Sequence, residues 1–242
     1  SKAKVDLNIA NNTLTNSGSF LASGNLTVRS TNASGTLTLT NTGRMQSGAA
    51  LDLAGYNNTD TVNITNDGGG VLLGDTLSLK AKNLTNSGAA SVIQGTQGSS
   101  TNITDTLNNA GTFVLSDTAG RDETLNTGTL VNSGTIQSKA KVDLNIANNT
   151  LTNSGKLLAG DNLTINDTTV SGDLSITNSG RIRSVNSLNL TGYSNTDALN
   201  ITNQTGGVIL AGTLTLKAKN LTNSGSAFIQ GTQGSSTNIT DT

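Results

Sequence analysis

The stretch LTNSG, at Leu14–Gly18, decides the fold, because the chain repeats it unchanged at Leu84–Gly88, Leu151–Gly155 and Leu221–Gly225. A looser form, Leu or Ile followed by any residue, Asn, one or two residues and Gly, occurs ten times. The asparagines of the ten copies are Asn16, Asn41, Asn66, Asn86, Asn109, Asn132, Asn153, Asn178, Asn203 and Asn223. Successive asparagines lie 20 to 25 residues apart, and a period of this size with variation in the loops is typical of a solenoid.

A longer repeat encloses the short one. The segment Ser1–Gly18 returns without change at Ser138–Gly155, an offset of 137 residues, and GYNNTD (Gly55–Asp60) keeps the same register with GYSNTD (Gly192–Asp197). We therefore interpret 1–242 as a single rod segment, with a first long repeat at 1–137 and a second, truncated one at 138–242. The opening residues carry no signal peptide, so we expect the segment to come from the interior of a longer chain.

Composition excludes several classes of function. The 242 residues are 33% hydrophobic and 12% charged, with a net charge of -1, which argues against a nucleic-acid partner. The chain has no Cys and no His, so thiol catalysis and the common zinc sites are excluded. No apolar run approaches the length needed to cross a bilayer, so we expect no membrane insertion. We expect neither a metal nor a cofactor.

The segments between the asparagines predict strands. VDLNI (Val5–Ile9), TLTLTNTG (Thr36–Gly43) and FVL (Phe113–Leu115) represent three short apolar or alternating pieces in each period. Alternation with period two indicates β-structure, and no window carries a helical stripe. We therefore predict an all-β fold, a right-handed parallel β-helix (β-solenoid) of about ten coils of 20–25 residues, with three short strands per coil.

The repeated Asn and Gly receive a structural role in such a fold. Gly allows sharp corners, and asparagines stacked at equivalent corners can hydrogen-bond to one another along the axis as a ladder. The Leu or Ile two residues before each Asn is expected to point inward and to stack into an aliphatic column. These ten asparagines are therefore predicted to form a structural corner ladder and not a repeated active site.

Repeats such as NLTNSG (Asn83–Gly88) and DLNIANNTLTNSGKLLAG (Asp143–Gly160) resemble those of filamentous haemagglutinin-type exoproteins of Gram-negative two-partner secretion. That family comprises large adhesins and carriers of contact-dependent inhibition toxins, both linked to virulence. The resemblance covers essentially the whole chain. The Asn-Pro motifs usual in the family's secretion domain are absent, because the chain has no Pro, so we assign it to the interior repeat region.

The resemblance implies a secreted protein displayed on the bacterial cell surface. Its expected partners are the outer-membrane two-partner secretion pore during export, and a receptor or glycan on a host or neighbouring cell. The function expected from it is that of a structural and adhesive filament segment, which extends a distal binding or toxin domain from the cell. We expect no enzyme activity and no catalytic residue.

The alternative is a carbohydrate-binding or carbohydrate-cleaving β-helix. Tyr56 and Asp60, with their counterparts Tyr193 and Asp197, are the candidate glycan contacts, because a tyrosine ring can stack on a sugar while a carboxylate accepts from its hydroxyls. The competing interpretation is that the duplication simply copied a loop. Lysine pairs, at Lys2/Lys4, Lys80/Lys82, Lys139/Lys141 and Lys217/Lys219, are either small anion-binding patches or solvated surface that opposes aggregation.

Overall fold

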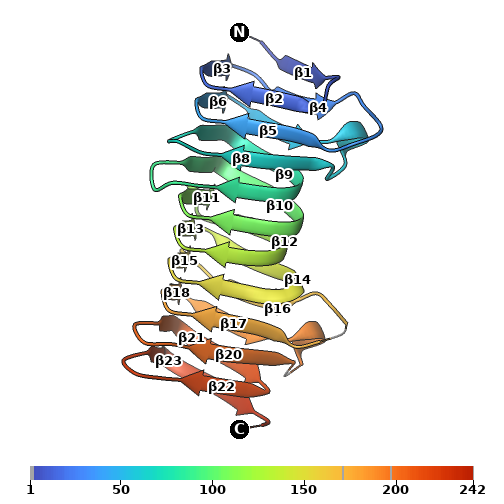
Figure 1. Ribbon diagram of the computed structural model, residues 1–242. Helices are drawn as coiled ribbons and strands as arrows, with labels where there is room; N and C mark the ends of the chain where they lie inside the picture. Colours follow the sequence, from blue (N-terminus) through green and yellow to red (C-terminus); the bar gives the residue numbers. More distant parts are fainter. Residues whose placement is uncertain (1–2, 171, 197, 242) are drawn as a thin grey trace.

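The structure is a computed structural model that describes residues 3–170, 172–196 and 198–241 of the chain. The chain winds into an elongated stack of coils with its two ends at opposite ends of the stack (Figure 1). All strand pairings among the described residues are parallel and join one coil to the next. The predicted β-solenoid of about ten coils is thus confirmed.

Each coil has three faces. Face A opens the coil and contains β1 (Val5–Ile9), β4 (Leu26–Ser30), β7 (Ala50–Ala54), β16 (Leu163–Asp167) and β19 (Ser187–Thr191). Face B follows and contains β2 (Thr13–Asn16), β5 (Leu37–Asn41), β8 (Val62–Asn66), β17 (Leu174–Asn178), β20 (Leu199–Asn203) and β22 (Asn220–Asn223). Face C closes the coil with β3 (Ser19–Ala22), β6 (Arg44–Ser47), β11 (Thr112–Ser116), β13 (Thr135–Ser138), β15 (Lys156–Ala159) and β18 (Arg181–Ser184).

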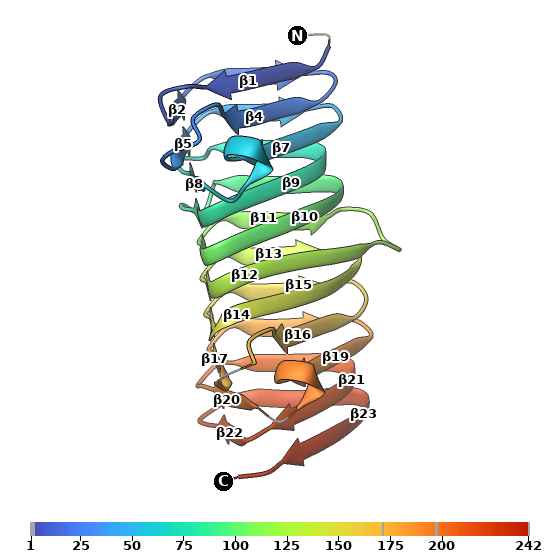
Figure 2. The ribbon, with the colours of Figure 1, turned by 90° about the vertical axis from the view of Figure 1, so that its right-hand side faces the viewer.

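Six longer strands continue around corners and belong to more than one face. They are β9 (Val71–Asn86), β10 (Val92–Asn109), β12 (Asp122–Asn132), β14 (Lys141–Asn153), β21 (Val208–Ala218) and β23 (Phe228–Ile239). In Figure 1 the face B strands run from right to left, and in Figure 2 the face A strands run toward face B as the chain descends. This winding is right-handed, the hand that parallel crossovers favour.

The core consists of aliphatic side chains stacked in register from coil to coil. Leu14 pairs with Leu39 and Leu39 with Ile64, and the same register continues to Leu221. Within this column the middle members are fully buried, whereas Leu14 and Leu221 are partly exposed because they lie in the end coils. The aliphatic column predicted from the sequence is confirmed. Each fully buried leucine stabilises the stack by about 2 kcal/mol.

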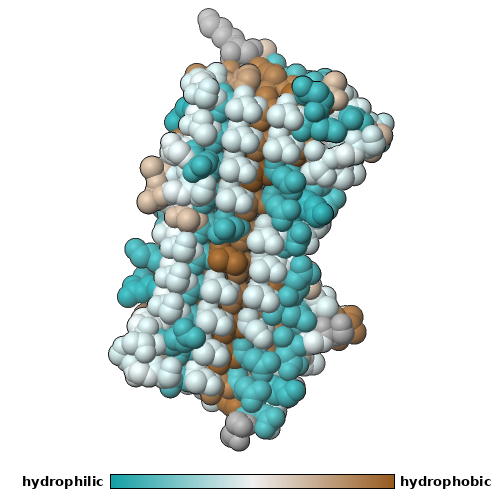
Figure 3. Space-filling view, viewed as in Figure 1, coloured by the Kyte–Doolittle hydropathy of each residue, from teal (hydrophilic) through white to brown (hydrophobic). Residues whose placement is uncertain are grey.

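Mostly polar residues occupy the outward positions of face B, which Figure 3 shows from the front, with Val131 as an exposed apolar exception. Thr15, Thr40, Thr65 and Thr85 stand side by side in one row across β2, β5, β8 and β9. Alternation along each strand thus places Leu or Ile in the core and the β-branched threonines toward solvent, where they suit a pleated surface.

Glycine is required at the corners for a second physical reason, besides the sharp turn expected from the sequence. Gly88 has a positive φ of 82°, a conformation that favours glycine. Gly155 is not among the positive-φ residues, but a Cβ placed on it would lie 2.0 Å from the carbonyl oxygen of Gly134 in the preceding coil. Close approach of backbones between coils, and not only backbone dihedrals, therefore requires glycine at this corner.

Two matching loops interrupt the corner between faces A and B. Short 3-10 turns, η1 (Tyr56–Asn58) and η2 (Tyr193–Asn195), project from it at corresponding points of the two long repeats (Figure 2). Asn57 and Asn58 adopt positive φ values of 49° and 62°, which asparagine tolerates better than most residues. The irregular parts of the coil are thus confined to its loops, and the strands remain in register.

Candidate functional site

The asparagines of the short repeat form one continuous hydrogen-bonded ladder inside the rod. The side-chain Nδ2 of each asparagine donates to Oδ1 of the asparagine in the next coil, at 2.7 to 2.9 Å. The ten members, in order, are Asn16, Asn41, Asn66, Asn86, Asn109, Asn132, Asn153, Asn178, Asn203 and Asn223. The first nine are buried and the last is exposed. Chains of such bonds polarise and strengthen one another in a low-dielectric interior.

Each ladder amide also bonds to the backbone of the corner. Asn109 Nδ2, for example, lies 3.2 Å from the carbonyl oxygens of Gly111 and of Thr135 in the following coil. None of the ten asparagines has a positive φ, so they do not turn the chain through left-handed geometry. Their amides instead fix the corner to the coils above and below, and the burial of the first nine keeps those amides away from any ligand.

Shorter asparagine ladders lie on the outer surface, and the sequence analysis missed them. On face A, Asn145 Nδ2 donates to Asn126 at 2.7 Å, and Asn166 Nδ2 donates to Asn145 at 3.3 Å. On face B, Asn83 donates to Asn63 at 2.9 Å. The available signal was the recurrence of Asn at outward positions one coil apart.

The candidate glycan contacts fall in two separate loops. Tyr56 begins η1 and Tyr193 begins η2, and both are half-buried. Six coils separate them, a distance of about 29 Å, so the two loops do not form one compact site. Asp60 Oδ2 accepts a hydrogen bond from Thr104 Oγ1 at 2.5 Å, which ties the η1 loop to a later coil. Asp197 lies outside the described residues.

Four of the eight lysines in the predicted pairs take part in surface ion pairs. Lys4 contacts Asp6 at 3.0 Å, Lys139 contacts Asp117 at 2.8 Å, Lys141 contacts Asp143 at 3.0 Å and Lys219 contacts Asp173 at 3.3 Å. The hydrogen bond and the charge of Asp143 raise the pKa of Lys141. Such exposed pairs contribute little stability. Lys2 lies outside the described residues.

One buried carboxyl was not anticipated from the sequence. Glu123 is 2% exposed and occupies an inward position of face A, in register with Val142 of the next coil. Burial raises the pKa of Glu123, although its carboxylate accepts a hydrogen bond from the backbone N–H of Ser99 at 2.6 Å. Asp122 precedes it on the same strand and therefore points to the opposite side of the sheet. These two carboxyls do not face each other across a cleft, as a pair of glycosidase carboxyls does.

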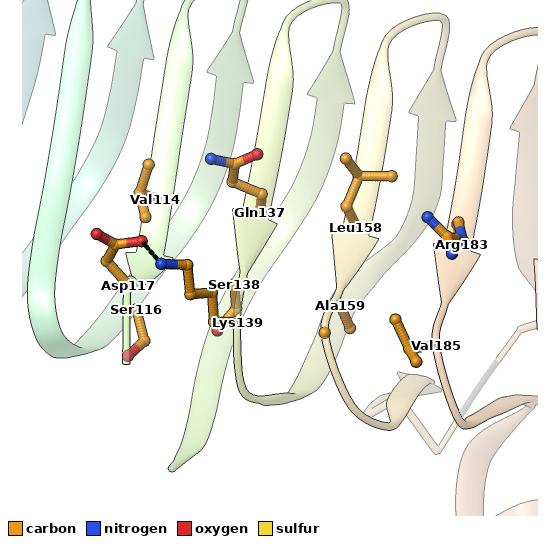
Figure 4. Close-up of a pocket in the computed structure, with 11 residues that line it drawn as sticks. Val114, Ser116, Asp117, Gln137, Ser138, Lys139, Leu158, Ala159, Arg183 and Val185 are labelled. Carbon is orange, nitrogen blue, oxygen red and sulfur yellow. Dashed lines mark ion pairs between the residues drawn. The ribbon is translucent and has the colours of Figure 1, made fainter. Parts of the chain in front are cut away.

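A shallow hollow lies on face C across the boundary between the two long repeats. It has a volume of about 240 Å³ and is lined by Val114, Leu158, Val185, Gln137 and Arg183, with the Lys139–Asp117 ion pair at one end (Figure 4). Its floor is aliphatic and its rim is charged. This combination can contact a ligand that has both apolar and charged groups.

Other kinds of site find no support in the described part of the chain. Among residues 3–170, 172–196 and 198–241, no three His, Cys, Asp or Glu side chains gather in a way that could hold a metal ion. Over the same residues, no helix combines the length and apolar character that a bilayer crossing requires. No protein-family model, no curated protein and no solved structure matches the chain.

Proposed function

We propose that the chain is a structural and adhesive filament segment of a secreted cell-surface protein. In this role the rod extends a distal binding or toxin domain away from the cell. The observation that carries the proposal is the asparagine ladder, which runs without a break from the first coil to the last. A chain that repeats the same corner in every coil can be lengthened by adding coils without changing its cross-section.

The coil-by-coil construction supports a spacer role. Each strand pairs with its equivalents in the neighbouring coils, so stability is approximately a sum of similar coil and interface terms. Each long repeat of 137 residues spans six coils, which adds about 29 Å to the rod. Duplication of the long repeat is therefore a direct way to set the reach of a domain carried at the end.

The setting of the proposal follows from the resemblance to filamentous haemagglutinin-type exoproteins. Export through an outer-membrane pore requires a chain that passes unfolded and folds outside, and the absence of Cys means that no disulfide has to form on the way. We assign the chain to a Gram-negative cell surface, with the secretion pore as the partner during export. A receptor or glycan on another cell is the partner of the displayed filament.

The length relation provides the first test. Proteins with one, two and three complete long repeats are compared by small-angle X-ray scattering and negative-stain electron microscopy. We expect the maximum dimension to increase by about 29 Å with each added repeat. Particles whose length does not increase, or which become globular, would contradict the proposal.

Surface display requires a separate test in the cell that produces the protein. Antibodies against the η1 loop, which projects from the rod, should label intact cells, and deletion of the secretion pore should abolish the labelling. Labelling that depends on breaking the cells would contradict the assigned location.

A carbohydrate platform is the second candidate, because the duplication places a half-buried tyrosine in a projecting loop twice. The hydrogen bond from Thr104 to Asp60 occupies one of the carboxylate oxygens that would have to receive a sugar hydroxyl. Tyr56→Ala combined with Tyr193→Ala in a glycan-array experiment distinguishes the two functions. Loss of a specific glycan signal would favour the platform, and an unchanged array would favour the spacer.

A further inference from the structure

Face C of the second long repeat carries three cations without partners. Lys156, Arg181 and Arg183 are exposed on β15 and β18. Within the described part of the chain, none of these three side chains takes part in an ion pair or a hydrogen bond. We call these three residues the basic cluster. It is a local surplus of positive charge in a chain whose net charge is -1.

The first long repeat shows what this surface looks like without the basic cluster. At an offset of 137 residues, Ser19 stands in place of Lys156 and Gln46 in place of Arg183. The remaining cation of the first repeat, Arg44, donates from Nε to Gln46 Oε1 at 2.7 Å. The second repeat therefore has three free cations where the first has a self-contained Arg–Gln pair, although the segment before the site, Ser1–Gly18 against Ser138–Gly155, is identical in the two repeats.

This replacement has an electrostatic cost in the free protein. Lys156 and Arg181 are directly opposite each other in the parallel register of β15 and β18. Like charges at directly opposite positions destabilise a sheet. An anion bound between them would remove this repulsion, so the arrangement favours a negatively charged ligand.

The hollow beside the basic cluster restricts the kind of anion. Leu158, Val185 and Arg183 line the hollow (Figure 4). Lys156 lies two residues before Leu158 on the same outward side of β15, next to the hollow. Val185 is 48% exposed. A ligand that carries negative groups next to an apolar face would contact both the cations and this aliphatic floor. A pyranose ring with a carboxylate or sulfate substituent has both features.

We propose that the basic cluster and the adjoining hollow bind an acidic polysaccharide. The guanidinium groups would pair with its carboxylates or sulfate esters, which arginine holds in bidentate geometry, while the sugar C–H face packs on Leu158 and Val185. Single-stranded nucleic acid is disfavoured because no aromatic ring lines the hollow for base stacking. An anionic membrane is disfavoured because recognition of its surface takes about four to eight clustered cations. The inference does not depend on the filament role.

The test uses the 242-residue protein and compares defined probes by biolayer interferometry at two salt concentrations. Polygalacturonate tests carboxylates, heparin tests sulfate esters, and neutral dextran is the uncharged control. We expect binding to one or both acidic polymers, weakened at the higher salt concentration, and no binding to dextran. Equal or tighter binding to single-stranded DNA, or to vesicles with anionic lipids, would overturn the assignment to polysaccharide.

Two variants locate the site. Lys156→Ser combined with Arg183→Gln restores the residues of the first long repeat, which the fold demonstrably accommodates, and should weaken binding at least tenfold. Lys80→Ser combined with Lys82→Gln removes the same charge from exposed or half-exposed positions elsewhere and should leave binding unchanged. The proposal fails if the wild-type protein binds neither acidic polymer, or if both double variants lose binding equally.

Discussion

Replacement of one rung in the middle of the asparagine ladder should destabilise the rod far more than replacement of the last rung. Asn86 accepts from Asn66 Nδ2 at 2.9 Å and donates to Asn109 Oδ1 at 2.8 Å and to the Thr112 carbonyl at 3.2 Å. Asn86→Ala removes these three hydrogen bonds, each of which stabilises by about 1 kcal/mol net. It also leaves Asn109 Oδ1 buried without a donor, at a cost of about 1 to 3 kcal/mol. The expected loss in the free energy of unfolding is therefore about 4 to 6 kcal/mol.

Asn223 provides the matched control, because it is the last member of the same ladder and is exposed. It accepts from Asn203 at 2.8 Å and donates to the Ala227 carbonyl at 3.1 Å. Water can replace both partners after Asn223→Ala, so the expected cost is below about 1 kcal/mol. Urea unfolding followed by far-UV circular dichroism measures both variants. With an m-value of about 3 kcal/mol/M, the midpoint of Asn86→Ala should fall by more than about 1 M.

A second substitution separates hydrogen bonding from side-chain volume. Asn86→Asp keeps the shape and the acceptor for Asn66, but an ionised carboxylate cannot donate to Asn109, so two acceptors face each other. We expect a loss at neutral pH at least as large as that of Asn86→Ala, with partial recovery when acid protonates the carboxyl. Equal effects at Asn86 and Asn223, or an Asn86→Ala cost below about 1 kcal/mol, would refute the ladder as a source of stability.

Three further substitutions test other features of the rod. Gly155→Ala should prevent native folding as judged by circular dichroism, because the new Cβ would lie 2.0 Å from a carbonyl oxygen of the preceding coil. Gly18→Ala is the control and should be tolerated, because a Cβ at that position meets nothing within 4 Å. Glu123→Gln should raise the melting temperature at pH 7. Burial raises the pKa of Glu123 in the folded state, so ionisation of this carboxyl lowers the stability as the pH rises from the ordinary glutamate pKa through the raised value. The gain should vanish below about pH 4, where the carboxyl is protonated. Asp167→Ser should also stabilise the protein in urea unfolding, because Asp167 Oδ2 is buried without a hydrogen-bond partner and the equivalent Ser30 donates a hydrogen bond through its hydroxyl. An unchanged or lowered stability would contradict either of the last two expectations.

The fold was predictable because its determinants are periodic. The Leu or Ile two residues before each ladder asparagine fixed which side of the strand faces the core, and the regular spacing of the asparagines fixed the coil length. A one-residue slip would have turned every leucine outward. The predicted contacts between Asn16 and Asn41, and between their successors, follow from that register.

The features that could not be predicted from the sequence depend on contacts made by single residues. The need for glycine at Gly155 arises from the approach of Gly134 across the coil boundary, which no local pattern encodes. Glu123 and Ser99 interrupt a largely apolar inward row, and the backbone N–H of Ser99, in the previous coil, donates to the buried carboxylate. The basic cluster was visible as a difference between the two long repeats, but its lack of partners required the side-chain positions. The repeated residues predict the fold, whereas the positions at which the two long repeats differ indicate candidate binding residues.

The spacing of the ladder has a consequence for how the rod folds. Nearly every strand pairing that holds a coil joins residues 19 to 27 positions apart, so the relative contact order is about 0.1, a value usual for helical bundles and low for an all-β protein. This value decreases further as coils are added, because the loops to be closed stay the same size while the chain lengthens. Each completed coil presents an open strand edge and a free amide on which the next coil can form. The chain can therefore fold progressively, as a template extended one turn at a time, and the loop closed at each step keeps the same size whatever the final length.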